Sequence, residues 1–181
     1  MKKIALFIFM LISVSINSQS KYLTKTGTIN FEASVPSFEE VAAKNNSVTA
    51  ILNTENGEFA ALALVKAFRF KNALMEEHFN ENYVESDEFP KAIFKGTISD
   101  FDFNKLGTTQ NKSTINGSLT FHGVTKKIEI PLTITLIDGK INMSGNFKVL
   151  VSDFDIEIPK IVQNKLSNEV LVDFSFELSK K

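Results

Sequence analysis

Along most of this chain, apolar residues alternate with polar ones at every second position. Residues 128 to 136 illustrate the pattern, because isoleucine or leucine occupies every even position while mostly polar residues occupy the odd ones. A period of two is typical of a β-strand that buries one of its faces. The same pattern predicts strands at residues 29 to 33, 48 to 52, 115 to 121, 141 to 149 and 170 to 178.

Two further strands are predicted at residues 58 to 70 and 92 to 103. The stretch FAALALVKAFRF, residues 59 to 70, is apolar on both faces over several positions, which indicates that another element covers its outer side. The predicted cover is a short helix at about residues 72 to 84. Asn72 suits its N-cap, and apolar or aromatic side chains recur at helical spacing at Leu74, Met75, His78, Phe79 and Tyr83.

Two tight turns are predicted to join strands into hairpins. Asp138-Gly139 suits one turn, which pairs Leu136 with Ile141, Ile134 with Met143, Leu132 with Gly145 and Ile130 with Phe147. Gly123-Val124 suits the centre of a type II′ turn, with His122 opposite Thr125 and Leu119 opposite Ile128. His122 would then be the shoulder of a turn, on the polar face. Eight strands in hairpin order predict an all-β fold, an antiparallel barrel or sandwich.

The composition is that of an ordinary globular chain. Of its 181 residues 43% are hydrophobic, which is enough for one well-buried core, so one domain is expected. The 20 basic and 21 acidic side chains nearly cancel. No global field therefore favours nucleic acid or an anionic membrane as a partner.

The first 18 residues have the pattern of a secretory signal peptide. Lys2 and Lys3 precede an apolar run from Ile4 to Ile12, which is too short to span a membrane, and small residues follow. Cleavage is expected between Ser15 and Ser20, leaving residues 19 to 181 as a single domain without an integral membrane segment. The chain has no cysteine, so neither a disulfide nor a lipid-modified cysteine is expected. The protein should be periplasmic or secreted.

Candidate chemical groups are few. Neither a second histidine nor a cysteine lies near His122 in the sequence, and Asp153 with Asp155 supply too few ligands for calcium and no general-acid partner. Residues 152 to 159 are interpreted instead as closing one end of the barrel. His78 is interpreted as a half-buried packing residue, and the acids between residues 76 and 88 as a solvated face. The sequence therefore predicts no metal site, no cofactor and no catalysis.

Two motifs resemble the YceI-like family. GSLTFHGVTKKIEIPLTI, residues 117 to 134, is similar to a leucine-threonine-x-histidine-glycine-valine-threonine-lysine turn of that family. HFNENYVESDEFPKAIFKGTI, residues 78 to 98, is similar to its helix followed by an aromatic-proline strand start. The resemblance covers about residues 21 to 179. It implies a lipocalin-like, eight-stranded antiparallel barrel, export, and an apolar tunnel that in some members holds a polyisoprenoid chain.

One position departs from the family pattern. A leucine and an arginine frequently follow the helix histidine in the family, whereas Phe79 and Asn80 follow His78 here. A cationic head-group contact from that arginine position is therefore not carried over to this chain.

The inward apolar stripe has two interpretations. In one, side chains fill the barrel and the protein is a non-catalytic interaction or stress-protective module. In the other, which the resemblance favours, the stripe lines a tunnel, and the protein binds and carries or sequesters an apolar small molecule, an isoprenoid lipid above all. Gly117 and Gly145 would leave space inside. The predicted lining is Phe31, Phe94, Leu119, Phe121, Leu132, Ile134, Met143, Phe147, Phe174 and Phe176.

Overall fold

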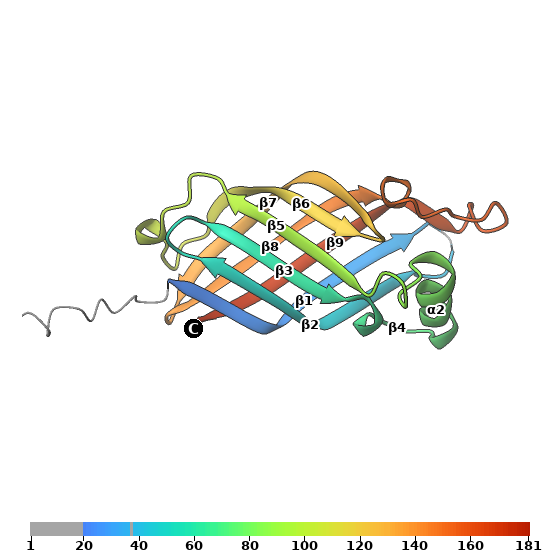
Figure 1. Cartoon of the computed structure of the whole chain (residues 1–181), viewed down its shortest axis with the longest axis horizontal. Helices are drawn as coiled ribbons and strands as arrows, with labels where there is room; N and C mark the ends of the chain where they lie inside the picture. Colours follow the sequence, from blue (N-terminus) through green and yellow to red (C-terminus); the bar gives the residue numbers. More distant parts are fainter. Residues whose placement is uncertain (1–19, 37) are drawn as a thin grey trace, which may run out of the picture.

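Antiparallel strands wind into a closed barrel in the computed structural model, which describes residues 20–36 and 38–181 (Figure 1). Eight long strands run in the ring order β1-β9-β8-β7-β6-β5-β3-β2, and β1 pairs with β2 to close it. The predicted all-β, eight-stranded antiparallel barrel is thereby confirmed. The strands are β1 (Lys21–Ser34), β2 (Ala42–Asn53), β3 (Glu58–Leu64), β5 (Lys91–Ile98), β6 (Asn111–Phe121), β7 (Val124–Ile137), β8 (Lys140–Leu150) and β9 (Leu166–Lys180).

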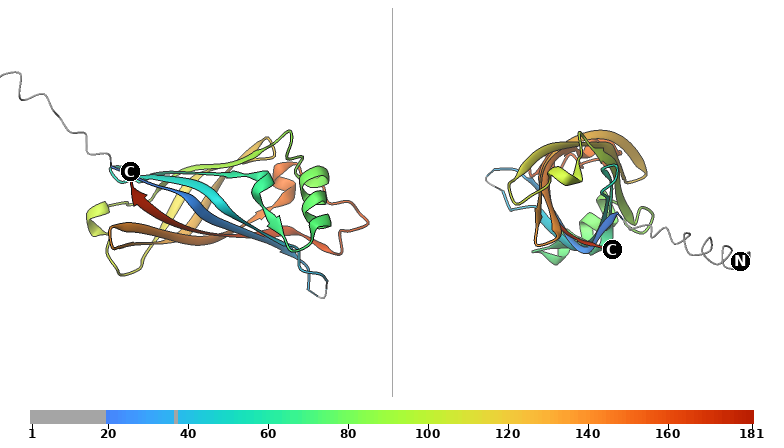
Figure 2. Two further views of the ribbon diagram at one scale, coloured as in Figure 1. Left: turned by 90° about the horizontal axis from the view of Figure 1, so that it is seen from below. Right: turned by 90° about the vertical axis from the view of Figure 1, so that its left-hand side faces the viewer.

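The ring of strands is seen end-on in the right-hand view of Figure 2. The C-terminus lies at one end of the barrel, and the helix α2 lies at the other (Figure 1). We call these the terminal end and the α2 end. The predicted signal peptide falls outside the described residues.

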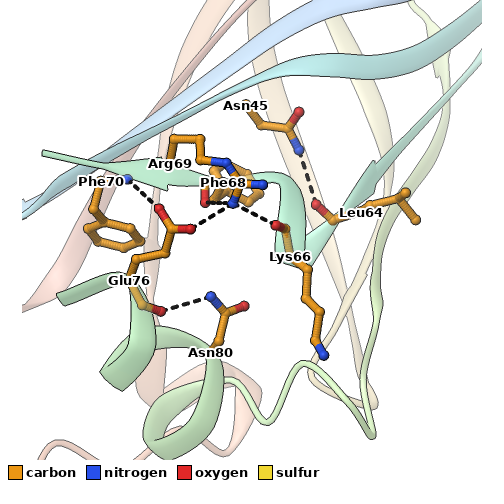
Figure 3. Close-up of polar contacts among 8 residues, drawn as sticks. All are labelled: Asn45, Leu64, Lys66, Phe68, Arg69, Phe70, Glu76 and Asn80. Carbon is orange, nitrogen blue, oxygen red and sulfur yellow. Dashed lines mark hydrogen bonds and ion pairs between the residues drawn. The ribbon is translucent and has the colours of Figure 1, made fainter. Parts of the chain in front are cut away.

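The strand predicted at residues 58 to 70 is interrupted. It ends as β3 at Leu64, turns through the 3-10 helix η1 (Val65–Ala67), and resumes as the two-residue strand β4 (Arg69–Phe70), which also pairs with β2. Asn45 bridges the interruption, because its side-chain amide donates to the Leu64 carbonyl at 3.1 Å (Figure 3). Its side-chain oxygen accepts from the Ser47 N–H at 2.9 Å. The other strand expected to be long, at 92 to 103, ends at Ile98.

The hairpin predicted at Asp138-Gly139 is confirmed. Both residues have positive φ, 50° and 74°, as a type I′ turn requires. The pairs Leu136–Ile141, Ile134–Met143 and Leu132–Gly145 all form. The predicted pair Ile130–Phe147 is wrong, since the β7–β8 ladder ends at Leu132–Gly145. Pro131 follows on that side and has no N–H to donate to the ladder.

The register predicted for the β6–β7 hairpin is wrong, because the centre of its turn lies one residue earlier in the chain than expected. The central residues of the turn are His122 and Gly123, with φ of 47° and 74°, and the flanking pairs are Phe121–Val124, Thr120–Thr125 and Leu119–Lys126. Two successive residues in the left-handed region make this a type I′ turn, not type II′. His122 is therefore at the tip of the turn and not at its shoulder.

The predicted helix is confirmed almost to its ends. α2 (Ala73–His78) continues as the π-helical turn η2 (Phe79–Tyr83), and the Asn72 side chain caps it by accepting from the Leu74 N–H at 2.9 Å. In Figure 1 the helix lies at the same end of the barrel as the β1–β2 loop and the long connection from β8 to β9.

The terminal half of the barrel is filled with side chains. Leu52, Ile134, Ile141 and Leu178 are at most 2% exposed there. The β5–β6 connection, with its 3-10 turn η3 (Phe103–Lys105), folds over this end and packs Phe103 against the ring of Tyr22, with centroids 5.8 Å apart in a tilted arrangement. The remaining helical turn, η4 (Val151–Phe154), lies at the opposite end.

Gly117 and Gly145 do not leave an empty space, so that expectation from the sequence is wrong. A Cβ atom at Gly117 would lie 2.5 Å from the ring of Phe94, and one at Gly145 would lie 2.8 Å from the ring of Phe174. Each glycine instead makes room for a phenylalanine ring from a neighbouring strand. Both rings add to the filled part of the interior.

We expect Asn45→Ala to lower the free energy of unfolding by about 1–3 kcal/mol, because it removes two hydrogen bonds, to the Leu64 carbonyl and from the Ser47 N–H, each of which contributes about 0.5–1.5 kcal/mol. Asn45 itself is fully buried. Chemical denaturation measures the change. The matched control is the exposed neighbour Asn46→Ala, expected to stay within about 0.5 kcal/mol of the wild type. Equal effects of the two substitutions would contradict the bridging role.

Candidate functional site

A cavity of about 560 Å³ occupies the α2 end of the barrel. Its lining comes mainly from the inner faces of β1, β8 and β9, the helical turns α2 and η2, and the β8–β9 connection, with further residues from β3, β4, β5 and β6. Most of the lining is aliphatic or aromatic. A volume of this size falls within the range of small-molecule sites, which are concave and mostly apolar.

Four phenylalanines build one wall of the cavity. Phe31 of β1, Phe68, Phe70 of β4 and Phe79 of η2 lie with ring centroids 5.2–6.2 Å apart in tilted or edge-on arrangements. Such contacts add to the stabilisation that burial of the rings provides. The cluster joins the helix to the barrel, so the position of this wall depends on α2.

Glu76 fastens α2 to the strand below it. Its carboxylate accepts from the Arg69 guanidinium at 2.7 Å and from the backbone N–H of Phe70 at 3.1 Å (Figure 3). The side-chain amide of Asn80, one helical turn later, donates to the backbone carbonyl of Glu76 at 2.8 Å. Only 26% of the Glu76 side chain is exposed, so it does not belong to the solvated acidic face that the sequence predicted.

The polar lining residues lie where the helix and the loops of the α2 end meet the cavity, a region that we call the rim. They are Glu39, His78, Tyr83, Lys165 and Ser167. His78 is exposed, not half-buried as predicted. Beside the rim, Lys71 donates a hydrogen bond to Glu40, and this bond together with the carboxylate charge raises the pKa of Lys71 above its ordinary value.

The turn residue His122 ties three segments together. Its Nδ1 lies 2.8 Å from the carbonyl oxygen of Phe154 in η4, and its Nε2 lies 3.1 Å from the carboxylate of Glu85. The ring also meets Phe89 edge-on, with centroids 4.5 Å apart. Because both partners are acceptors, both contacts are hydrogen bonds only when the imidazole is protonated. This role is structural, and no feature of the alternating pattern predicted it.

The turn η4 covers the gap that opens where β7 and β8 part. Phe154 is 1% exposed and packs edge-on against Phe121 at 5.8 Å. Val65, Val84 and Ile156 complete a small second core beneath it. The segment from 152 to 159 therefore closes part of the α2 end, as the sequence predicted.

The predicted lining residues fall into three groups. Phe31, Leu119, Phe121 and Phe147 line the large cavity. A second void of about 70 Å³ is lined by Leu119 and Phe147 again, together with Phe94, Leu132, Met143, Phe174 and Phe176. Ile134 lines neither space and belongs to the filled terminal half.

Several lining residues were not predicted. Val149, Val170 and Val172 share the inward parity of their strands, so the alternating pattern contained the information needed to find them. Phe68, Phe70, Phe79 and Phe154 come from interrupted or helical segments, where a period of two gives no guide.

Neither a metal site nor a membrane span is found in the part of the chain that the structure describes. Across residues 20–36 and 38–181, no three side chains of histidine, cysteine, aspartate or glutamate come together as metal ligands. No helix in these ranges is both long enough and apolar enough to cross a membrane.

Comparisons with known proteins agree with this fold. A family model described as the YceI-like domain matches residues 18–178. A polyisoprenoid binding domain from Saccharophagus degradans, implicated in plant cell wall breakdown, superposes with a TM-score of 0.77 at 16% identity over 90% of this chain and 99% of its own. Burkholderia cenocepacia BcnA superposes with a TM-score of 0.69 at 14% identity, covering 84% and 96%. A search of curated proteins gives no match.

We expect His122→Ala to cost about 1–3 kcal/mol of stability, because the Phe154 carbonyl loses its donor and the side chain is nearly buried. The matched control is Asp138→Ala. Asp138 is exposed and has a similar φ of 50° in the other type I′ turn, so it reports the cost of a left-handed alanine alone. Thermal or chemical unfolding measures both. Equal losses would show that the His122 contacts contribute nothing.

We expect Glu76→Ala to loosen α2 from β4, because both side-chain oxygens of Glu76 hold that strand. Amide hydrogen exchange of residues 73–83 should accelerate while that of β7 and β8 stays unchanged. Glu77→Ala, an exposed neighbour on the same helix, serves as the control and should leave exchange as in the wild type. Uniform acceleration across the barrel would mean that Glu76 acts on global stability instead.

Proposed function

This chain belongs to the YceI-like family, and we propose that it binds an apolar ligand, an isoprenoid lipid, inside its barrel and carries or sequesters it. The observation that carries the proposal is the apolar cavity of about 560 Å³ at the α2 end. Eight-stranded barrels have room for about one small ligand when side chains do not fill them. Here the filling is confined to one half.

The distribution of polar groups suggests how the ligand lies. The cavity wall is aromatic and aliphatic, so a polar group placed deep inside would lose its hydration without a hydrogen-bond partner. Lys165, His78 and Glu39 at the rim supply charged or hydrogen-bonding groups. A ligand with one apolar chain and a polar head therefore fits with its chain inward and its head at the rim.

Transfer of the apolar chain of such a ligand from water into the cavity is favourable in free energy. Each buried methylene contributes about 0.8 kcal/mol, so a chain of several isoprene units supplies enough free energy for specific binding without any ion pair. The polyisoprenoid binding domain of Saccharophagus degradans, which has the same fold, supports the choice of an isoprenoid over other apolar molecules.

The proposal also includes export of the protein from the cytoplasm. A basic start followed by a short apolar run is typical of a cleaved signal peptide, and we propose that the protein works in the periplasm or outside the cell. Its role there is carriage or sequestration without catalysis.

The test is mass spectrometry of organic extracts from protein purified without detergent out of its native compartment. The wild type should contain an isoprenoid lipid in near-stoichiometric amount. Ala33→Phe should lose at least nine-tenths of it with little change in melting temperature, because Ala33 lines the large cavity and the new ring would occupy the space of the ligand.

The matched control is Glu32→Phe, which places the same ring on the exposed outer face of β1 and should retain the lipid. Wild-type protein without any lipid, which also fails to bind added prenols, would refute the proposal. That result would favour an interaction or stress-protective barrel.

A further inference from the structure

We infer that the barrel sets an upper limit on the length of the chain that it binds, through a narrow neck and a rigid aromatic floor. This inference rests on the proposed function and names a structural determinant of its specificity. The two internal spaces of the barrel and the residues that separate them carry it.

The neck is the boundary between the large cavity and the void of about 70 Å³. Six residues line both spaces: Ile29, Ala63, Ala92, Leu119, Phe147 and Val172. They come from six different strands, β1, β3, β5, β6, β8 and β9, so they surround the axis of the barrel. A chain that enters at the rim must pass between them to reach the deeper void, and the bulk of Phe147 and the smallness of Ala92 set the width of the passage.

The floor consists of four phenylalanine rings below the neck. Phe59, Phe94, Phe174 and Phe176 all line the deeper void. Phe174 and Phe176 stack at 5.3 Å with only 25° between their planes, and Phe59 lies 5.7 Å from Phe176 and 6.3 Å from Phe94. All four are at most 9% exposed.

Glycines hold the floor in place. The rings of Phe94 and Phe174 lie over Gly117 and Gly145, and a Cβ atom at Gly27 would lie 2.4 Å from the ring of Phe176. Each ring thus occupies the position that a neighbouring side chain would otherwise take. Rotating a ring away would open an empty space above a glycine, which close-packed interiors disfavour. Below the floor the terminal half is filled, so a ligand chain cannot continue through the barrel.

This geometry predicts how affinity depends on chain length. Burying one methylene contributes about 0.8 kcal/mol, which corresponds to about a fourfold gain in affinity. Affinity should therefore rise steeply with each added isoprene unit until the chain end meets the floor. Longer chains must leave units in water, so the affinity stops rising at a defined length, the break point.

The experiment measures dissociation constants of delipidated full-length protein for a series of all-trans prenols of increasing length, by displacement of a fluorescent apolar probe. Phe147 lines both the neck and the void above the floor, so Phe147→Ala enlarges the space open to the chain and should move the break point to a longer prenol, with at least a tenfold gain for the first prenol beyond the wild-type limit. Ala92→Leu narrows the same neck and should move the break point to a shorter prenol, with at least a tenfold loss there.

Opposite shifts from two substitutions in one neck separate a length limit from a general loss of stability. The control is Leu171→Ala, which removes apolar bulk from the outer face of β9 beside Val172 and should leave the series unchanged. If Phe147→Ala does not fold, the shift of the break point in Ala92→Leu alone tests the length limit.

Two results would overturn the inference, and they differ in what else they affect. Affinity that keeps rising through the whole series, or a break point that neither neck substitution moves, would refute the length limit while leaving lipid binding intact. Failure of every prenol to bind, with no lipid in the native protein, would remove the proposed function and the length limit together.

Discussion

The pairing of β1 with β2 closes the barrel, and this closure determines how the interior and both ends of the molecule are built. A closed ring has no free strand edge, so every long strand is paired on both sides along at least part of its length. Once the ring is closed, alternate residues of each strand must point into one enclosed space. The residues at these inward positions then decide whether that space is filled or hollow.

The interior is filled in one half of this barrel and hollow in the other. In the terminal half, bulky aliphatic side chains meet across the axis, and aromatic rings lie over glycines, so the interior is packed. In the α2 half, the β7–β8 ladder ends at Leu132–Gly145, and the interior holds the cavity of about 560 Å³. If the space between the unpaired parts of β7 and β8 were open to water, the apolar lining of the cavity would be exposed. The cover comes from Phe154, whose burial requires the loop to fold inward.

The cover of the α2 end is held by polar contacts at its edges. Glu76 joins α2 to β4, and His122 joins the β6–β7 turn to η4 and to the loop that carries Glu85. These contacts fix segments that the barrel ladder does not reach.

The features that depend on short-range rules could be predicted from the sequence alone. Alternation at every second position predicted the inward face of six strands, Asp138-Gly139 predicted a turn that needs two positive φ angles, and Asn72 predicted the start of the helix. The family resemblance added the closed eight-stranded form. Each of these rests on neighbours in the chain or on a motif that can be read directly.

Which inward residues surround the cavity could not be predicted from the sequence, because it depends on how the strands pack in three dimensions. Leu119 and Ile134 both occupy inward positions of their strands and are similar in size. Leu119 nevertheless lines the cavity, whereas Ile134 lies in the packed half. Likewise, Gly145 was expected to leave space, but the ring of Phe174 from the neighbouring strand fills it. His122 finds its partners 32 and 37 residues away. The physical reason is the same in each case: packing depends on residues that the closed ring brings together across the barrel, and alternation along one strand carries no information about them.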